Sequence, residues 1–505
     1  MREEFEYIIS KQMDSRKREV ITIPSSQEQN INSGLHCIVE MDEICRYMGF
    51  LIIIDSKKQI RMQKLLGYGE QVISITKSSE TTSIGGVPGE IYAGEWEIIF
   101  GIFTEYLEQK LGEQTATIRI TITDEPTECT EAIGKWCFVD GMHGLQIAEE
   151  NYSYDKCIQT ESKWYKGDFH THTTLSDGKD TVRHAMEKAV KQGLDFYVPT
   201  EHNVMHTGWC DTKLLILPGI EITTVVGHFN IFGIKDQPIA LATLLLSSDN
   251  EIIQECCIQI MKEARQQGAI ISINHPFLHI WKWLGGEIPL TLIDCMEIIN
   301  DPTYDYAKES NDKAIAFLDF LWQDGHKIFG VGGSDAHNLT EERYTGATEP
   351  SIIGDPATYV YCDTLTPRKL LNHVKQGNVL VTRYIEIIPE IIVGEQSYLP
   401  GSEIMSSEDI RYHIVIKQCE QLPIVYVVCN GKKTELTVRQ SEDGTYYANA
   451  SISYEGQEWQ WIRMEVRSKE GAFLAYSNPV YRGKMESRFI TYKDALSAME
   501  EVDAN

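Results

Sequence analysis

The pattern of hydrophobic and polar residues changes twice along this chain of 505 residues, from alternation to a helix-and-strand pattern and back to alternation. In the first part they alternate, as in the run TIRITIT (117–123), which is the pattern of a half-buried strand. Alternation returns near the end in RYHIVIK and IVYVV, and the hairpin signal Asn430-Gly431 follows the second run. We therefore predict a β-rich domain over 1–158, a β-sandwich-like domain over 387–485, and a terminal helix or tail over 486–505.

Between about 159 and 386 the pattern changes to helix, glycine and strand, and this unit occurs three times. The first helix follows Asp180, which is placed to cap it, and ends at Gly193 before the strand-like run LDFYVPT. The other two helices end at Gly268 and Gly325, before the runs AIISIN and KIFGV. This alternation favours an α/β fold with a parallel sheet or barrel, whose functional residues gather at the carboxyl ends of the strands.

Histidine and acidic residues follow the ends of these predicted strands. The stretch DFHTHTTLSDG (168–178) contains two histidines at alternate positions, which share one face of an extended segment. Four later strand-like runs also end in such residues. The candidate ligands are His170, His172, Asp177, His202, Glu221, His228, His275, Asp335 and His337.

Imidazole and carboxylate ligands together suit Zn, Mn or Fe, whereas Ca or Mg would favour oxygen ligands alone. Nine candidates are more than one ion needs, so we expect two or three divalent ions with Glu221 as a bridging carboxylate. Such a centre holds a hydroxide that can attack an ester. Hydrolysis would then need no separate nucleophilic side chain.

Composition narrows the class of protein. A 42% hydrophobic and 24% charged chain is typical of globular proteins, and we find no apolar run long enough to span a membrane. The net charge of -28 argues against binding to nucleic acid or to anionic membranes, which require basic patches. The twelve cysteines form no CxxC pair, which favours reduced thiols. No secretory signal is recognisable at the N-terminus, so we expect a cytoplasmic protein and leave open whether it forms a homo-oligomer.

Five motifs in one order, DFHTHTTLSDG, PTEHN, GIE with GHF, INHP and GGSDAHN, resemble those of the PHP (polymerase and histidinol phosphatase) superfamily of metal-dependent hydrolases. The β-rich flanks, LDFYVPTEHN and VGGSDAH look more specifically like the subgroup that includes the carbaryl-hydrolase-type metallohydrolases. The resemblance covers the middle of the chain strongly and the flanks loosely. It implies a distorted β/α barrel over 159–386.

The resemblance also implies which residues share an ion. The first ion would be held by His170, His172, Glu221 and Asp335, the second by Glu221, His228 and His275, and the third by Asp177, His202 and His337. Asp335 would also be catalytic, because it would orient the metal-bound hydroxide. Glu201, beside His202, would orient a ligand or be structural.

The expected substrate is a small-molecule ester. A phosphoesterase is the leading hypothesis, because three adjacent ions would neutralise the oxygens of a phosphate. The alternatives are a carboxylic or carbamate ester hydrolase with the same site, and a non-catalytic metal-stabilised binding module. Four residues near the ligand motifs are candidates for binding the substrate, with a structural or surface role as the alternative for each: Asn203, His279, Trp281 and Arg343.

Overall fold

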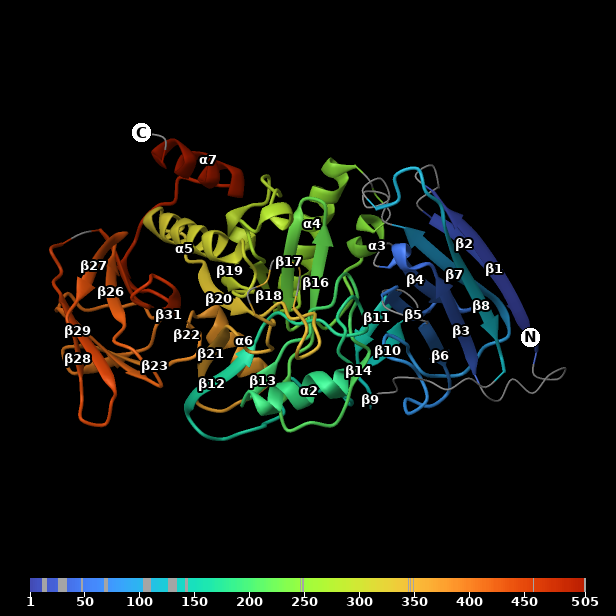
Figure 1. Cartoon of the computed structure of the whole chain (residues 1–505), viewed down its shortest axis with the longest axis horizontal. Helices are drawn as coiled ribbons and strands as arrows, with labels where there is room; N and C mark the ends of the chain where they lie inside the picture. The colour runs from blue at the N-terminus through green and yellow to red at the C-terminus, as the bar shows by residue number, and fades with distance from the viewer. Residues whose placement is uncertain are drawn as a thin grey trace.

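The computed structural model describes the chain except for residues 11–15, 26–33, 47–48, 68–70, 103–109, 126–133, 141–143, 246, 248, 344, 346, 348, 457 and 504–505. The fold is mixed α/β, with many strands and few helices. Figure 1 shows the N-terminal strands at one end, the segment with most helices in the middle, and the C-terminal strands at the other end.

The N-terminal part contains two antiparallel sheets that share one hydrophobic cluster. The alternating isoleucines of TIRITIT point into this cluster and are almost fully buried, as the sequence predicts. The first sheet has the order β1 (Arg2–Ile9), β8 (Ala116–Thr123), β3 (Leu35–Met41) and β6 (Gln71–Ile75). The second has the order β2 (Arg16–Ile23), β7 (Gly94–Ile102), β4 (Gly49–Ile54) and β5 (Ile60–Leu65). η1 (Glu43–Cys45) connects β3 to β4 in this part. β9 (Gly134–Lys135), β10 (Cys137–Asp140) and β11 (Gly144–Ile147) follow β8 and lead into the middle of the chain.

The middle of the chain contributes to two sheets. Five strands form one sheet, in the order β16 (Gly219–Thr224), β17 (Gly227–Phe232), β18 (Ile270–Ile273), β19 (Cys295–Asn300) and β20 (Phe329–Gly333). The other sheet begins with β15 (Leu215–Ile216), β13 (Phe196–Tyr197), β12 (Lys163–Asp168), β21 (Ala357–Cys362) and β22 (Val379–Thr382). The short strand β14 (Gly208–Trp209) pairs with β9.

Only part of this arrangement is parallel. β12, β13 and β15 run parallel, as do β18, β19 and β20, whereas β17 is antiparallel to both of its neighbours. The reason is local: β16 and β17 are joined by a tight turn, and parallel neighbours require a long crossover. A continuous β/α barrel is not confirmed, because the described strands form two sheets that are linked by the isolated bridges Thr171–Ala336 and His202–Glu221.

The three predicted helix units are present, with one correction. α2 (Val182–Lys191) is capped by Thr181, whose side chain accepts a hydrogen bond from His184 N, whereas the predicted cap Asp180 pairs with Lys188 instead. The predicted glycine ends all have positive φ, between 68° and 82°. The other helices are α3 (Ala240–Leu244), α4 (Asn250–Gln266), η2 (His279–Trp281), η3 (Leu290–Leu292), α5 (Ala307–Gln323), α6 (Pro367–Lys375) and α7 (Tyr492–Asp503). Among the described residues, each helix is too short or too polar to cross a bilayer.

The C-terminal strands form a sheet of their own and also extend the sheet of the middle segment. Asn430 and Gly431 both have positive φ and connect two paired strands, as the hairpin signal predicts. The separate sheet has the order β24 (Gln396–Tyr398), β23 (Glu386–Val393), β25 (Ile410–Lys417), β29 (Tyr446–Ile452) and β28 (Val438–Gln440). Beyond β22, the sheet of the middle segment continues in the order β31 (Phe473–Ser477), β30 (Trp459–Arg467), β26 (Ile424–Cys429) and β27 (Lys432–Leu436). β32 (Val480–Gly483) also pairs with β30.

Several contacts attach the C-terminal segment to α5. The guanidinium of Arg463 in β30 is fully buried and donates two hydrogen bonds to Asp319 of α5, at 2.6 and 2.7 Å. The predicted tail is the helix α7, which lies beside α5, and the rings of Tyr492 and Phe317 are 5.0 Å apart (Figure 1). The domain limits proposed from the sequence stay predictions. One hydrogen-bonded sheet contains strands from both sides of the limit at residue 387, because β22 pairs with β31.

Candidate metal centre

All nine candidate ligands lie together at one end of the two middle sheets. His170 and His172 follow β12 in an extended segment, so their imidazoles lie on the same side, as predicted, and their ring centres are 5.2 Å apart. The segments after β13, β18 and β20 supply further histidines and aspartates. The antiparallel direction of β17 brings its first residues, including His228, to the same edge.

The first group of ligands consists of His170, His172 and Asp335, whose ligating atoms all lie within 4.8 Å of one another. Asp335 Oδ1 lies 3.2 Å from His170 Nε2 and 3.1 Å from His172 Nε2. Glu221 lies next to this group, with its two carboxylate oxygens 3.3 and 3.5 Å from the same two nitrogens. This is the set that the resemblance assigns to one ion.

The second group consists of His202, Glu221 and His228. Glu221 Oε2 is 2.7 Å from His202 Nδ1, and Glu221 Oε1 is 3.2 Å from His228 Nδ1. His275 lies farther away, with its Nε2 atom 3.7 Å from Glu221 Oε1 and 4.0 Å from Asp335 Oδ2. His202 therefore takes the position in this group that the resemblance gave to His275.

The third group consists of His172, Asp177, His202 and His337. Asp177 lies between two imidazoles, with 3.3 Å from Oδ2 to His202 Nε2 and 3.2 Å from Oδ1 to His337 Nε2. The rings of His172 and His337 are stacked with centres 4.0 Å apart. The three residues of the predicted third set thus lie close together, and His172 and His202 each belong to two groups.

The donor atoms fit divalent ions. The Nε2 atoms of His170 and His172 are buried, face carboxylate oxygens, and make no hydrogen bond to any described residue. The other ring nitrogen of His170 bonds to Glu297 Oε1 at 2.7 Å, and His337 Nδ1 donates to the carbonyl oxygen of Asp335 at 2.7 Å. A bond at one nitrogen leaves the lone pair of the other for a metal ion. A cation between the imidazoles and the carboxylates would satisfy both.

The carboxylates of the site stay ionised, as cation binding requires. Burial opposes ionisation of Asp335 and Glu221, but the facing histidines outweigh it and hold both pKa values well below their usual range. Burial and the neighbouring imidazoles lower the pKa of His172 to about 4. Burial alone would lower the pKa of His170. The nearby carboxylates, of which Asp335 has the largest effect, outweigh burial and raise this pKa well above its usual value. A bound ion would replace that proton.

Sequence reasoning missed Glu297, whose carboxylate is hydrogen-bonded to two candidate ligands, His170 and His275. Besides its bond to His170, its carboxylate accepts hydrogen bonds from the backbone N–H of His275 at 2.9 Å and from Asn300 Nδ2 at 3.0 Å. Asn300 Nδ2 also lies 3.4 Å from Asp335 Oδ2. The available signal was a glutamate inside the otherwise apolar run CMEII, because a buried carboxylate requires partners.

Glu201 holds the loop that follows His172. It is fully buried and accepts hydrogen bonds from Thr173 N at 3.0 Å, from Ser176 Oγ, and from His206 Nε2 at 2.7 Å. Burial opposes its ionisation, but His206 and the other partners lower its pKa to about 2. A charged Glu201 therefore fixes the loop between two ligands.

Strained backbone is concentrated at this site. His275 and Asp335 have φ values of 27° and 51°, and Asn203, next to His202, has 55°. Asp301, directly after β19, has 31°. Such conformations are costly for residues other than glycine and often mark functional positions.

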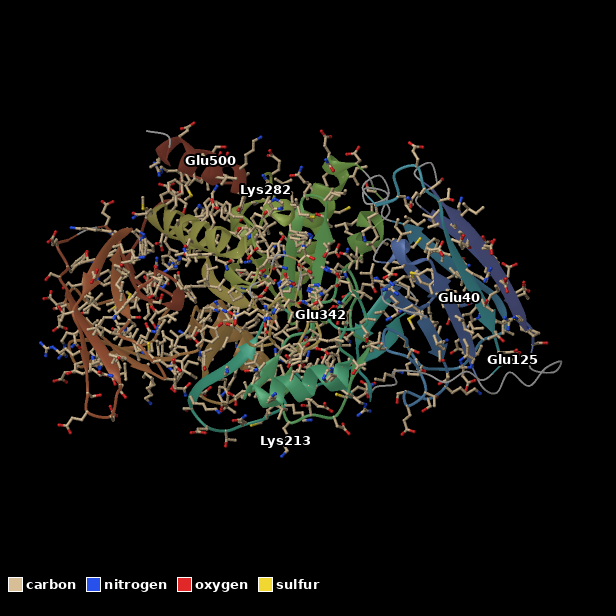
Figure 2. All side chains as sticks on the ribbon, in the orientation of Figure 1. Glu40, Glu125, Lys213, Lys282, Glu342 and Glu500 are labelled. Carbon is tan, nitrogen blue, oxygen red and sulfur yellow. The ribbon has the colours of Figure 1, made fainter. Side chains whose placement is uncertain are left out.

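A cavity of about 530 Å³ opens over the ligands. Trp281 and Arg343, two of the predicted substrate residues, line it together with Leu278, Asp301 and Tyr304. Figure 2 labels Glu342, another lining residue, near the centre of the molecule.

The other two predicted substrate residues have different surroundings. Asn203 exchanges two hydrogen bonds of 2.9 Å with the backbone of Thr223, and so holds β16 beside Glu221. His279 stacks on Tyr306 with ring centres 4.7 Å apart. Neither is among the residues that line the cavity.

Comparisons with known proteins do not identify a family. No protein-family model matches the chain, and no curated protein is significantly similar to it. Among solved structures, an amidohydrolase from Chromobacterium violaceum with bound sulfate and no metal is 14% identical, over 34% of this chain and 87% of the other. Its TM-score of 0.21 is too low to support an argument about fold or activity. The likeness to the PHP superfamily therefore rests on the sequence motifs.

Proposed function

We propose that this protein is a polynuclear metal-dependent hydrolase of the PHP type, which acts on phosphate esters. The observation that carries the proposal is the overlap of three groups of His, Asp and Glu ligands at the floor of one cavity. Groups that share ligands would place their ions next to one another, as in a catalytic polynuclear centre, whereas structural ions are usually bound at separate sites. The two bridged sheets of the middle segment would be a strongly distorted β/α barrel.

Two or three Zn, Mn or Fe ions held by these residues would activate a water molecule for attack and neutralise charge on the substrate. Asp335 would orient that water, since its carboxylate lines the cavity and is held by His170, His172 and Asn300. The apolar side chains around the cavity would exclude bulk water from the reacting ester.

Arg343 is the cation best placed to bind a phosphate oxygen. It lines the cavity, is exposed, and makes no ion pair with any described residue, whereas Lys179 in the same lining pairs with Glu342. Arginine matches the geometry of phosphate oxygens and donates charge-assisted hydrogen bonds to them. This arrangement supports an anionic substrate.

We expect Arg343→Ala to lower kcat/KM for a phosphate ester roughly tenfold, mainly through KM, because a charge-assisted hydrogen bond contributes about 1.5 kcal/mol. Steady-state kinetics measures this, with Arg343→Lys retaining part of the effect. The control is Arg439→Ala on β28, which is exposed and outside the cavity lining. An equal loss with an uncharged ester would show that Arg343 does not recognise the phosphate.

The proposal is tested by assaying metal-loaded protein against p-nitrophenyl phosphate, bis(p-nitrophenyl) phosphate and naphthyl esters of carboxylic and carbamic acids. Turnover of the phosphate substrates is expected. Turnover of the carbonyl esters alone would overturn the phosphoesterase and support the alternative, which the apolar lining by Leu278, Trp281 and Tyr304 favours. Fewer than two ions per chain together with no turnover would favour a metal-stabilised binding module.

A further inference from the structure

We propose that strand β5 of the N-terminal part positions the third group of ligands, so that Gln63 and Lys64 act as positioning residues for the metal centre. The inference rests on the proposed function insofar as it concerns bound ions. It assigns a role to a segment that contains none of the candidate ligands. In Figure 1, β5 lies on the side of the N-terminal sheets that faces the middle of the molecule.

Gln63 reaches the turn that carries His202. Its side chain is almost fully buried, and Nε2 donates a hydrogen bond of 3.0 Å to the carbonyl oxygen of Asn203, 140 positions later in the chain. Asn203 is held at a positive φ of 55°, an unfavourable conformation that requires support from its surroundings. Gln63 therefore stabilises the strained residue next to a ligand shared by two groups.

Lys64 reaches the loop between His172 and Asp177. Its side chain is also buried, and the ammonium group donates to the carbonyl oxygen of Thr174. The next residue in this loop, Leu175, packs against the backbone of Gly85, where a Cβ atom would come within 2.6 Å of it. Gly85 in turn accepts a hydrogen bond from Gln63 N at 3.1 Å. Strand β5 and its neighbouring turn thus hold this loop by polar and apolar contacts.

These two supported segments supply most of the third group. His202 directly precedes Asn203 in the chain. His172 begins the supported loop, and Asp177 ends it two positions after Leu175. The first group has different support, because Asp168 accepts hydrogen bonds from His170 N and Ser334 N at 3.1 and 3.0 Å within the middle sheets. Loss of the β5 contacts should therefore loosen the third group most, because it takes three of its four ligands from the two supported segments.

The experiment uses the full chain with Gln63→Met and Lys64→Met, singly and together. Methionine keeps an unbranched side chain and removes the donors, so the apolar packing changes little. Lys64→Arg is the conservative variant, since it can still donate to the Thr174 carbonyl. Lys77→Met is the matched control, because Lys77 is half exposed and pairs with the exposed Glu90 away from the site.

The first readout is the number and affinity of bound Zn ions, measured by metal titration. The double variant is expected to bind its weakest ion about 10- to 100-fold less tightly, the range typical when a support of a metal ligand is removed, and to keep the tighter ions. Lys64→Arg should restore most of the affinity lost in Lys64→Met. Unchanged affinity for every ion would overturn the proposal.

The second readout needs no metal. In metal-free protein, amide hydrogen exchange of peptides covering 173–177 and 202–207 is expected to be about tenfold faster in the double variant, while peptides covering 329–335 stay unchanged. Uniformly faster exchange across the chain would show that β5 contributes only general stability, and would overturn the positioning role. If the wild-type protein binds no divalent ion, the proposed function fails, and this readout still decides whether β5 positions the loops.

Discussion

Asp335→Ala is expected to lower kcat for ester hydrolysis by more than about 100-fold. A loss of up to that size is typical when a residue that only supports a metal ligand is changed. Asp335 Oδ1 is the oxygen shared by His170 and His172, so its removal takes away a ligand and the group that orients the attacking water. His172→Ala should have a comparable effect, because His172 belongs to two of the three groups. Turnover and metal content of both variants are measured against the wild type.

The fold should survive these substitutions, because Asp335 and His172 lie at the ends of the sheets and belong to none of the hydrophobic clusters. Thermal unfolding of the metal-free proteins checks this. The matched control is Asp305→Ala, an exposed aspartate close in sequence to the cavity residue Tyr304 and outside the ligand groups. Unfolding of the whole chain in Asp335→Ala would show that the ions are chiefly structural, and full activity would remove Asp335 from the mechanism.

Removal of metal by a chelator is expected to eliminate turnover and to lower the unfolding temperature. The physical reason is that the buried Nε2 atoms of His170 and His172 have no hydrogen-bond partner among the described residues and that a bound ion would satisfy them. A ligand present at 100 times its dissociation constant stabilises the folded state by about 2.7 kcal/mol. Calorimetry and activity before and after chelation measure both effects.

Adding back Zn, Mn or Fe separately should restore the lost activity to different extents and so identify the metal that supports turnover. The control is the chelator-treated protein carried through the same steps without metal. Activity that persists in protein shown to be free of metal would contradict a metal-dependent mechanism. Restored stability without restored activity would favour the binding-module alternative.

Local patterns were sufficient to predict several of the regular elements. The alternation in TIRITIT and the helix, glycine and strand units depend on spacing alone, and the structure confirms the strand β8 and the helices that end before Gly193, Gly268 and Gly325. The cap of α2 was wrong by one residue, because Thr181 and Asp180 are both good capping residues and only the geometry of the turn selects Thr181. The pairing of strands could not be read in the same way, since β17 returns antiparallel after a turn.

The ligand types were predictable, because imidazoles and carboxylates at successive strand ends are unusual for any other purpose. The way they are shared was not. His202 lies 2.7 Å from Glu221 and also 3.3 Å from Asp177, a double role that depends on the angle of one ring between two groups. Spacing along the chain carries no information about that angle.

By itself, the sequence determined several of the helices and strands and the residue types of the candidate site, since these follow from residue types and their local periodicity. The assignment of the nine candidate residues as metal ligands stays a prediction. The tertiary structure decided what supports the site: Glu297 behind His170, and Gln63 and Lys64 reaching in from a distant strand. It also placed Asn203 and His279 outside the cavity lining. The physical reason is that hydrogen bonds over more than a hundred positions depend on how whole sheets pack, and packing is a property of the folded chain.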